Sequence, residues 1–151
     1  MDDTDPTDAP ARRPRLPDAS LPRADGGDAV PLRLPRTGTV LALPGPAPDA
    51  AARAWLAALA DAGATLRASD GRALVLIPEA AAARDLPGGV AVLVDERGRV
   101  AAAAGVEAPA LVITDQWGEV WHAQAVPPGG AWPDVAEVDR WLGYLAIRCG
   151  G

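Results

Sequence analysis

The fold is decided by residues 39–64, which read TVLALPGPAPDAAARAWLAALADAGA. The apolar run that opens this stretch ends at Pro44 and is typical of a strand buried on both faces of a sheet. A proline-rich turn follows, in which Asp49 is placed to cap the start of a helix that we expect to end at Gly63. Apolar side chains then recur at spacings of three and four, which predicts one buried helix face. They are Ala52, Trp55, Leu56 and Leu59.

Strands and helices alternate along the rest of the chain. Apolar runs at 73–79 and 89–98 predict two further strands, each followed by a short alanine-rich helix. Residues 109–126 read as two strands joined by a turn, and a helix with Pro133 near its start closes the chain. Two strand-like pieces flank a turn at residues 25–28. This order predicts the α/β class, with a mixed sheet of about five to seven strands and helices on both faces.

Composition limits the classes of protein to consider. The 151 residues suffice for one domain, and we expect a disordered tail over residues 1–15, which are acidic and proline-rich, before a folded domain over 16–151. The net charge of −6 argues against nucleic-acid binding. No apolar run is long enough to cross a membrane and no secretory signal is visible, so we expect a cytoplasmic location. The absence of Lys and Asn is typical of a GC-rich genome, and we expect a bacterial source.

Several short motifs occur in an order that is found in a known family. LPDASL at 16–21 and the Asp-Gly turn at 25–26 precede GTVLALPG at 38–45. VAVLVDERGRVAAAAGV at 90–106 and APALVITDQWGEV at 108–120 follow. Together these segments resemble the thioredoxin fold in its peroxiredoxin-like, or redoxin, form (AhpC/TSA-type), over about residues 16–148. The resemblance implies a thioredoxin-like sheet, a cis proline at Pro109, no cofactor, and an antioxidant or oxidoreductase activity.

The chain departs from this family where the family places its chemistry. Thioredoxins carry Cys-x-x-Cys and peroxiredoxins Thr-x-x-Cys at the turn before the helix, where the helix dipole stabilises a thiolate. The corresponding turn of this chain has no thiol and no neighbouring Ser or Thr; it consists of Pro44, Gly45, Pro46, Ala47, Pro48 and Asp49. The active site is therefore degenerate, and neither dithiol nor peroxidatic chemistry is expected at this turn. Whether the chain is an enzyme stays open.

Other residues offer weaker candidates for chemistry. Cys149 is the only thiol, which excludes an internal disulfide, and it either reacts or packs as a small apolar side chain. Its place at a helix C-terminus disfavours the thiolate. His122 has no second His or Cys at ligand spacing, so a solvated strand histidine is favoured over a metal ligand. No metal or cofactor is expected. Trp117 and Trp121 either anchor a protein partner or pack under the hairpin.

Two hypotheses of function follow from these patterns. In the first, the chain is a redoxin-type module that has lost its thiol chemistry and binds or scaffolds another protein through the old substrate groove, near residues 44–49 and 108–109. In the second, it is a residual thiol oxidoreductase or antioxidant protein that works through Cys149, together with a cysteine of a partner.

Overall fold

A five-stranded mixed sheet forms the centre of the structure, a computed structural model that describes residues 13–149. The strand order is β5-β4-β3-β6-β7. The strands span Gly38–Leu43 (β3), Gly71–Ile77 (β4), Ala91–Val94 (β5), Ala110–Thr114 (β6) and Val120–Ala125 (β7). Strands β4 and β5 run parallel to β3, whereas β6 is antiparallel to β3 and to β7. The predicted α/β sheet is confirmed.

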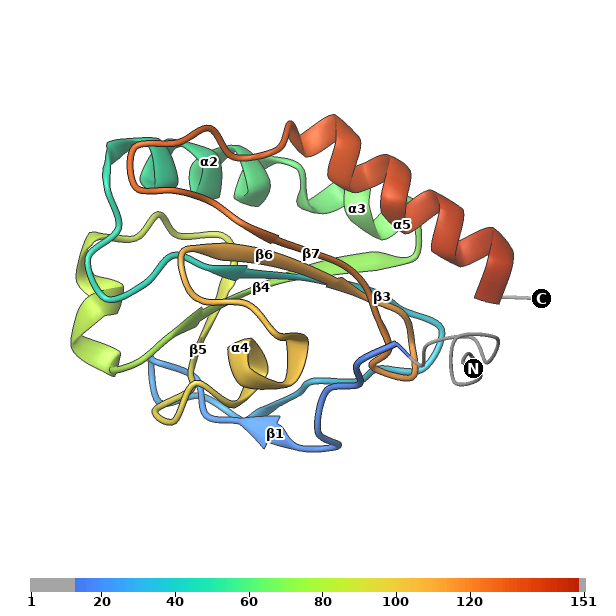
Figure 1. Ribbon diagram of the computed structural model, residues 1–151, viewed down its shortest axis with the longest axis horizontal. Helices are drawn as coiled ribbons and strands as arrows, with labels where there is room; N and C mark the ends of the chain where they lie inside the picture. Colours follow the sequence, from blue (N-terminus) through green and yellow to red (C-terminus); the bar gives the residue numbers. More distant parts are fainter. Residues whose placement is uncertain (1–12, 150–151) are drawn as a thin grey trace, which may run out of the picture.

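Helices cover both faces of this sheet. Helices α2 (Ala50–Asp61), α3 (Gly63–Ala68) and α5 (Val135–Cys149) lie above it, and α4 (Arg99–Ala104) lies below it (Figure 1). A small second sheet, made of β1 (Ser20–Leu21) and β2 (Val30–Pro31), also lies below, and the 3-10 helix η2 (Ala80–Asp85) joins β4 to β5. None of the helices in the described part of the chain has the length and apolar character that crossing a bilayer requires.

Each face of the sheet packs into a core of its own, because successive side chains of a strand point to opposite faces. In β3, Val40 and Ala42 pack under α2 and α5, whereas Leu41 and Leu43 pack against α4 and the N-terminal segment. Both sets are almost completely buried. The continuous apolar run of this strand is thus explained by cover on both sides.

The N-terminal segment pairs with both edges of the large sheet. Arg15 forms an antiparallel bridge with Glu119 at the start of β7, and Arg23 forms one with Leu93 of β5. Residues 13–15, which we expected to belong to a disordered tail, therefore lie along β7; residues 1–12 lie outside the described residues. Arg72 of β4 holds the middle of the segment, since its guanidinium donates to the Pro31 carbonyl. Burial lowers the pKa of Arg72 to about 10.

Candidate functional site

The proline-rich turn lies between the end of β3 and the start of α2. Pro44 and Gly45 are buried, and the backbone of Gly45 has a φ of 85°, a conformation that glycine adopts without steric cost. Pro46 and Ala47 are exposed. Pro44 ends the strand because proline has no backbone N–H to pair within a sheet, and Asp49 then caps the helix.

Asp49 closes the N-terminus of α2. One carboxylate oxygen accepts a hydrogen bond from the Ala52 N–H at 2.8 Å, as the capping prediction requires. The other accepts from the Gly129 N–H at 3.0 Å, which belongs to the loop between β7 and α5. These two bonds, that from Ala52 foremost, hold the pKa of the Asp49 carboxyl below its usual value of 3.8. An anion therefore already occupies the positive end of this helix.

Pro109 lies beside the turn. Leu43, the last residue of β3, pairs with Ala110, the first residue of β6, so the residues that follow one and precede the other are neighbours. The Ala108–Pro109 peptide bond is cis, which is the isomer that the resemblance implies. The Pro109 carbonyl accepts from the Val126 N–H at 2.8 Å, which ties the same loop to this end of the sheet.

A shallow hollow of about 270 Å³ opens next to the turn. Its walls are mostly apolar and come from Leu43, Pro46, Leu76, Ile77, Pro78, Ala101 and Ala108, with Asp95 and Glu96 at its border. Asp95 is engaged already, because its carboxylate accepts from the N–H groups of Arg99 and Val100 at the start of α4. No cysteine, serine, threonine or histidine is among the described residues that line the hollow.

The loop between β7 and α5 braces the other side of α2. The Trp132 ring stacks on the Trp55 ring with centroids 4.8 Å apart, and the Trp55 indole N–H donates to the Pro133 carbonyl. Together with the bond between Asp49 and Gly129, these contacts fix the first turns of α2 against residues some 80 positions later. These contacts hold the turn and the start of α2 in one fixed conformation.

Solved structures of known proteins share the overall fold of this chain. The chain is similar to AhpC from Mycobacterium tuberculosis, with a TM-score of 0.70 and 18% identity over 89% of this chain and 92% of that one. It is also similar to a thioredoxin-like protein from Porphyromonas gingivalis, with a TM-score of 0.64 and 19% identity over 90% and 94%. A peroxiredoxin-like protein from Aquifex aeolicus gives a TM-score of 0.64 and 18% identity over 89% and 86%. The chain has the thioredoxin fold.

These similarities establish the thioredoxin fold. They do not establish a shared chemistry, because sequence identities below 20% do not carry chemistry from one protein to another. No family model and no curated protein matches the sequence. Any function must therefore be argued from the residues of this chain.

The one thiol of the chain is remote from the turn of this thioredoxin fold. Cys149 is the last residue of α5, and its side chain lies outside what the structure describes. Helix α5 starts near α2 and runs to the opposite side of the molecule (Figure 1). Its 15 residues rise about 22 Å at the usual pitch of an α-helix. Helix α5 therefore does not bring its thiol to the proline-rich turn.

The two candidate tryptophans have different surroundings. Trp117, in the hairpin turn, is 49% exposed, whereas Trp121 on β7 is half-buried. Asp115 organises both, since one carboxylate oxygen accepts from the Trp117 backbone N–H and the other from the Trp121 indole N–H at 2.9 Å. No ring contact joins the two tryptophans within the described residues. Only Trp117 is largely exposed, and a role of the two tryptophans in partner binding stays a prediction.

Sequence reasoning missed the surroundings of His122. Instead of a solvated strand histidine, the structure shows a half-buried ring that stacks on Trp141 of α5 at 5.3 Å and contacts the Gln124 amide. Trp141 itself is half-buried: it packs against the core above the sheet and also lines an open pocket. The sequence held one signal for this cluster: Trp141 and Tyr144 are three residues apart, which places both rings on one face of the last helix. Among the described residues, no group of three or more His, Cys, Asp or Glu side chains is placed to hold a metal ion.

Proposed function

We propose that this chain is a thioredoxin-fold protein of redoxin ancestry that has lost thiol chemistry at its turn and acts as a protein-binding or scaffold module. The observation that carries the proposal is the position of the Asp49 carboxylate, which accepts from Ala52 and Gly129 at the N-terminus of α2. In the family that the sequence resembles, this end of the helix stabilises a thiolate. A carboxylate has no sulfur to oxidise, so it takes the electrostatic place of a thiolate without its redox chemistry.

The hollow beside the turn is the surface that we assign to binding. Its exposed rim contains Pro46 and Ala108, and its floor is apolar. Apolar floors with few polar groups suit a short segment of another protein better than a charged substrate. The braced loop and the Asp49 cap keep this surface preformed, which lowers the entropy cost of binding.

Residual thiol chemistry through Cys149 is the alternative. The exposed positions of Ile147 and Arg148 on the last turn of α5 are the observation that favours it, because they put the end of the helix at the surface. The negative end of the helix dipole at this place works against a thiolate. A reactive Cys149 would also have to act alone or with the thiol of another protein.

Intact mass spectrometry separates the two functions. We expect hydrogen peroxide to modify Cys149 in the native protein at neutral pH no faster than in the urea-unfolded chain, with Cys149→Ser as the control for oxidation at Met1. Oxidation much faster in the native than in the unfolded protein would support the alternative and contradict the loss of thiol chemistry.

Site-specific cross-linking tests the binding surface. A photoreactive side chain at Ala47 or Ala108, both exposed and beside the hollow, should cross-link the same protein partner in cells of the source organism. The matched control carries the probe at Ala64, which is exposed on α3, and should give no such product. Equal cross-linking from Ala64, or none from either position at the hollow, would contradict the proposed surface.

A further inference from the structure

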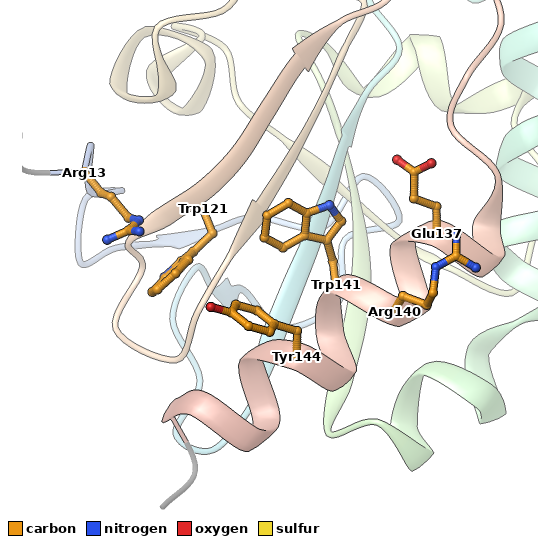
Figure 2. Close-up of a pocket in the computed structure, with 6 residues that line it drawn as sticks. All are labelled: Arg13, Trp121, Glu137, Arg140, Trp141 and Tyr144. Atoms are coloured by element: carbon orange, nitrogen blue, oxygen red, sulfur yellow. The ribbon is translucent and has the colours of Figure 1, made fainter.

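A second concave site lies between α5 and β7, which is an edge strand of the large sheet. The hollow beside the turn lies elsewhere, where β3 and β4 end. It has a volume of about 510 Å³ and is lined by Arg13, Trp121, Glu137, Arg140, Trp141 and Tyr144. Figure 2 shows three aromatic rings in a row, with Arg13 at one end and the side chains of Glu137 and Arg140 at the other. Volumes of this size are typical of small-molecule sites. This aromatic pocket is separate from the turn.

The aromatic rings are held in place by the rest of the protein. The Trp121 indole N–H donates to Asp115, which is a buried carboxylate. Trp141 stacks on His122 along its inner face. Tyr144 meets both tryptophans edge-on, with centroids 6.1 Å from Trp121 and 6.2 Å from Trp141. Because these contacts fix the rings, the walls of the pocket exist before any ligand arrives.

The charge of the pocket is opposite to that of the chain. Arg13 and Arg140 line it, and the Arg148 guanidinium lies 5.7 Å from the Trp121 ring centroid. Glu137 is the one acidic residue in the lining, so two lining arginines meet one carboxylate although the chain carries a net charge of −6. The ion pair recorded within residues 13–149 joins Arg15 to Glu119 and involves none of these groups.

The arginines also determine which sign of charge a ligand of this pocket should carry. An aromatic cluster alone would attract a cation to its ring faces. Here the Arg13 guanidinium already lies 3.6 Å from the centroid of the Trp121 ring and fills that role. A cationic ligand would meet like charge, whereas an anion would find guanidinium donors that bind carboxylates well.

We propose that the aromatic pocket binds a small planar aromatic carboxylate. Its ring packs against Trp141 and Tyr144, and its carboxylate accepts hydrogen bonds from the guanidinium group of Arg140, which lies on the same face of α5 as Tyr144, four residues later. Arg13, at the other end of the rings (Figure 2), adds positive charge without touching the carboxylate. The inference does not depend on the proposed function, because it uses neither the hollow nor Cys149.

Calorimetric titration of the full chain with indole-3-acetate tests the ligand class. We expect saturable binding that is about tenfold weaker for indole-3-acetamide, which keeps the ring and loses the charge. Cyclohexylacetate keeps the charge and loses the planar ring, and it should also bind more weakly. Tryptamine, with the same ring and a positive charge, should not bind. In heteronuclear NMR spectra the indole N–H signals of Trp121 and Trp141 should shift, and that of Trp55 should not.

Matched arginine variants locate the site. Arg140→Gln should weaken indole-3-acetate binding about tenfold and Arg13→Gln should weaken it less, whereas Arg84→Gln, an exposed arginine on η2 outside the pocket, should leave it unchanged. Both pocket arginines are exposed, so the variants should fold normally. The proposal is overturned if no saturable binding occurs, if the amide binds as tightly as the acid, or if Arg84→Gln has the same effect as the pocket variants.

Discussion

The carboxylate of Asp49 joins two segments that are distant in the sequence. One oxygen caps α2 through Ala52, and the other holds Gly129 in the loop before α5. Asp115 connects residues of the hairpin in a similar way. Its carboxylate accepts hydrogen bonds from the backbone N–H groups of Trp117 and Glu119 and from the Trp121 indole N–H. Each carboxylate thus positions a surface that we assign to binding, although neither touches a ligand itself.

The Asp49 interactions predict a pH-dependent contribution to stability. Because the folded state lowers the pKa of this carboxyl, the ionised form stabilises the fold. The contribution is complete above the unfolded value of 3.8 and is lost as the pH falls through the lower folded value. Asp49→Asn should therefore be less stable than the wild type at pH ~7, and this difference should shrink below pH ~4.

Urea denaturation of both proteins across this pH range measures the difference. Asp61→Asn is the control, because Asp61 is exposed at the end of α2 and has no recorded hydrogen bond to the described residues. A difference between wild type and Asp49→Asn that stays constant or grows on acidification would show that ionised Asp49 does not stabilise the fold.

Only part of this residue-scale chemistry could be predicted from the sequence. The cap by Asp49 follows from its position before a helix, because capping is a local interaction over three residues. The bond from Gly129 and the buried role of Asp115 could not be predicted, since both depend on contacts that only the folded chain creates. The same holds for His122, which the sequence places on a strand but not against Trp141.

Elements with strong periodicity were predictable because, like a helix cap, they are encoded in a short continuous stretch of sequence. Each strand of the large sheet and helices α2, α4 and α5 appear where the apolar pattern indicates them. The prediction that the helix ends at Gly63 was incomplete. Helix α2 ends at Asp61, but α3 begins at Gly63 and continues to Ala68, because Leu66 still packs into the core above the sheet. Tertiary packing thus extends a helical segment beyond a local stop signal.

Helix α5 lies close to the start of β4, and glycine permits this approach. A Cβ atom added to Gly71 would lie 2.4 Å from Cδ1 and 3.1 Å from Cγ of Leu142, which is itself buried. We expect Gly71→Ala to destabilise the protein by about 1–3 kcal/mol through overpacking, as measured by urea denaturation. Gly88→Ala, at an open position, is the control and should have little effect.

A double substitution shows whether Leu142 is the cause. Leu142→Val removes the Cδ atoms that a Cβ at Gly71 would meet. Gly71→Ala combined with Leu142→Val should be more stable than the sum of the two single effects predicts, by about 1 kcal/mol. Additive effects would place the strain of Gly71→Ala elsewhere.

At the scale of the whole molecule, one N-terminal segment closes both edges of the sheet. The Val120 N–H of β7 donates to the Pro14 carbonyl at 2.8 Å, and the Val94 N–H of β5 donates to the Pro22 carbonyl at 2.9 Å. Exposed sheet edges are prone to pair with other chains, so this arrangement protects them. The sequence did not indicate it, because short segments with little periodicity carry no signal for pairing with distant strands.

Removing residues 1–16 should uncover only one of these edges. The truncated protein loses the acceptor of Val120 but keeps that of Val94, so hydrogen exchange should become fast at the Val120 amide and stay slow at the Val94 amide. Leu16→Ala in the full chain is the matched control. It removes a completely buried side chain at a cost of about 3 kcal/mol but keeps the pairing, so the Val120 amide should stay protected relative to its neighbours. Equal protection of Val120 in the truncated and full-length proteins would mean that residues 13–16 do not close this edge in solution, and that the edge of β7 is available for another chain.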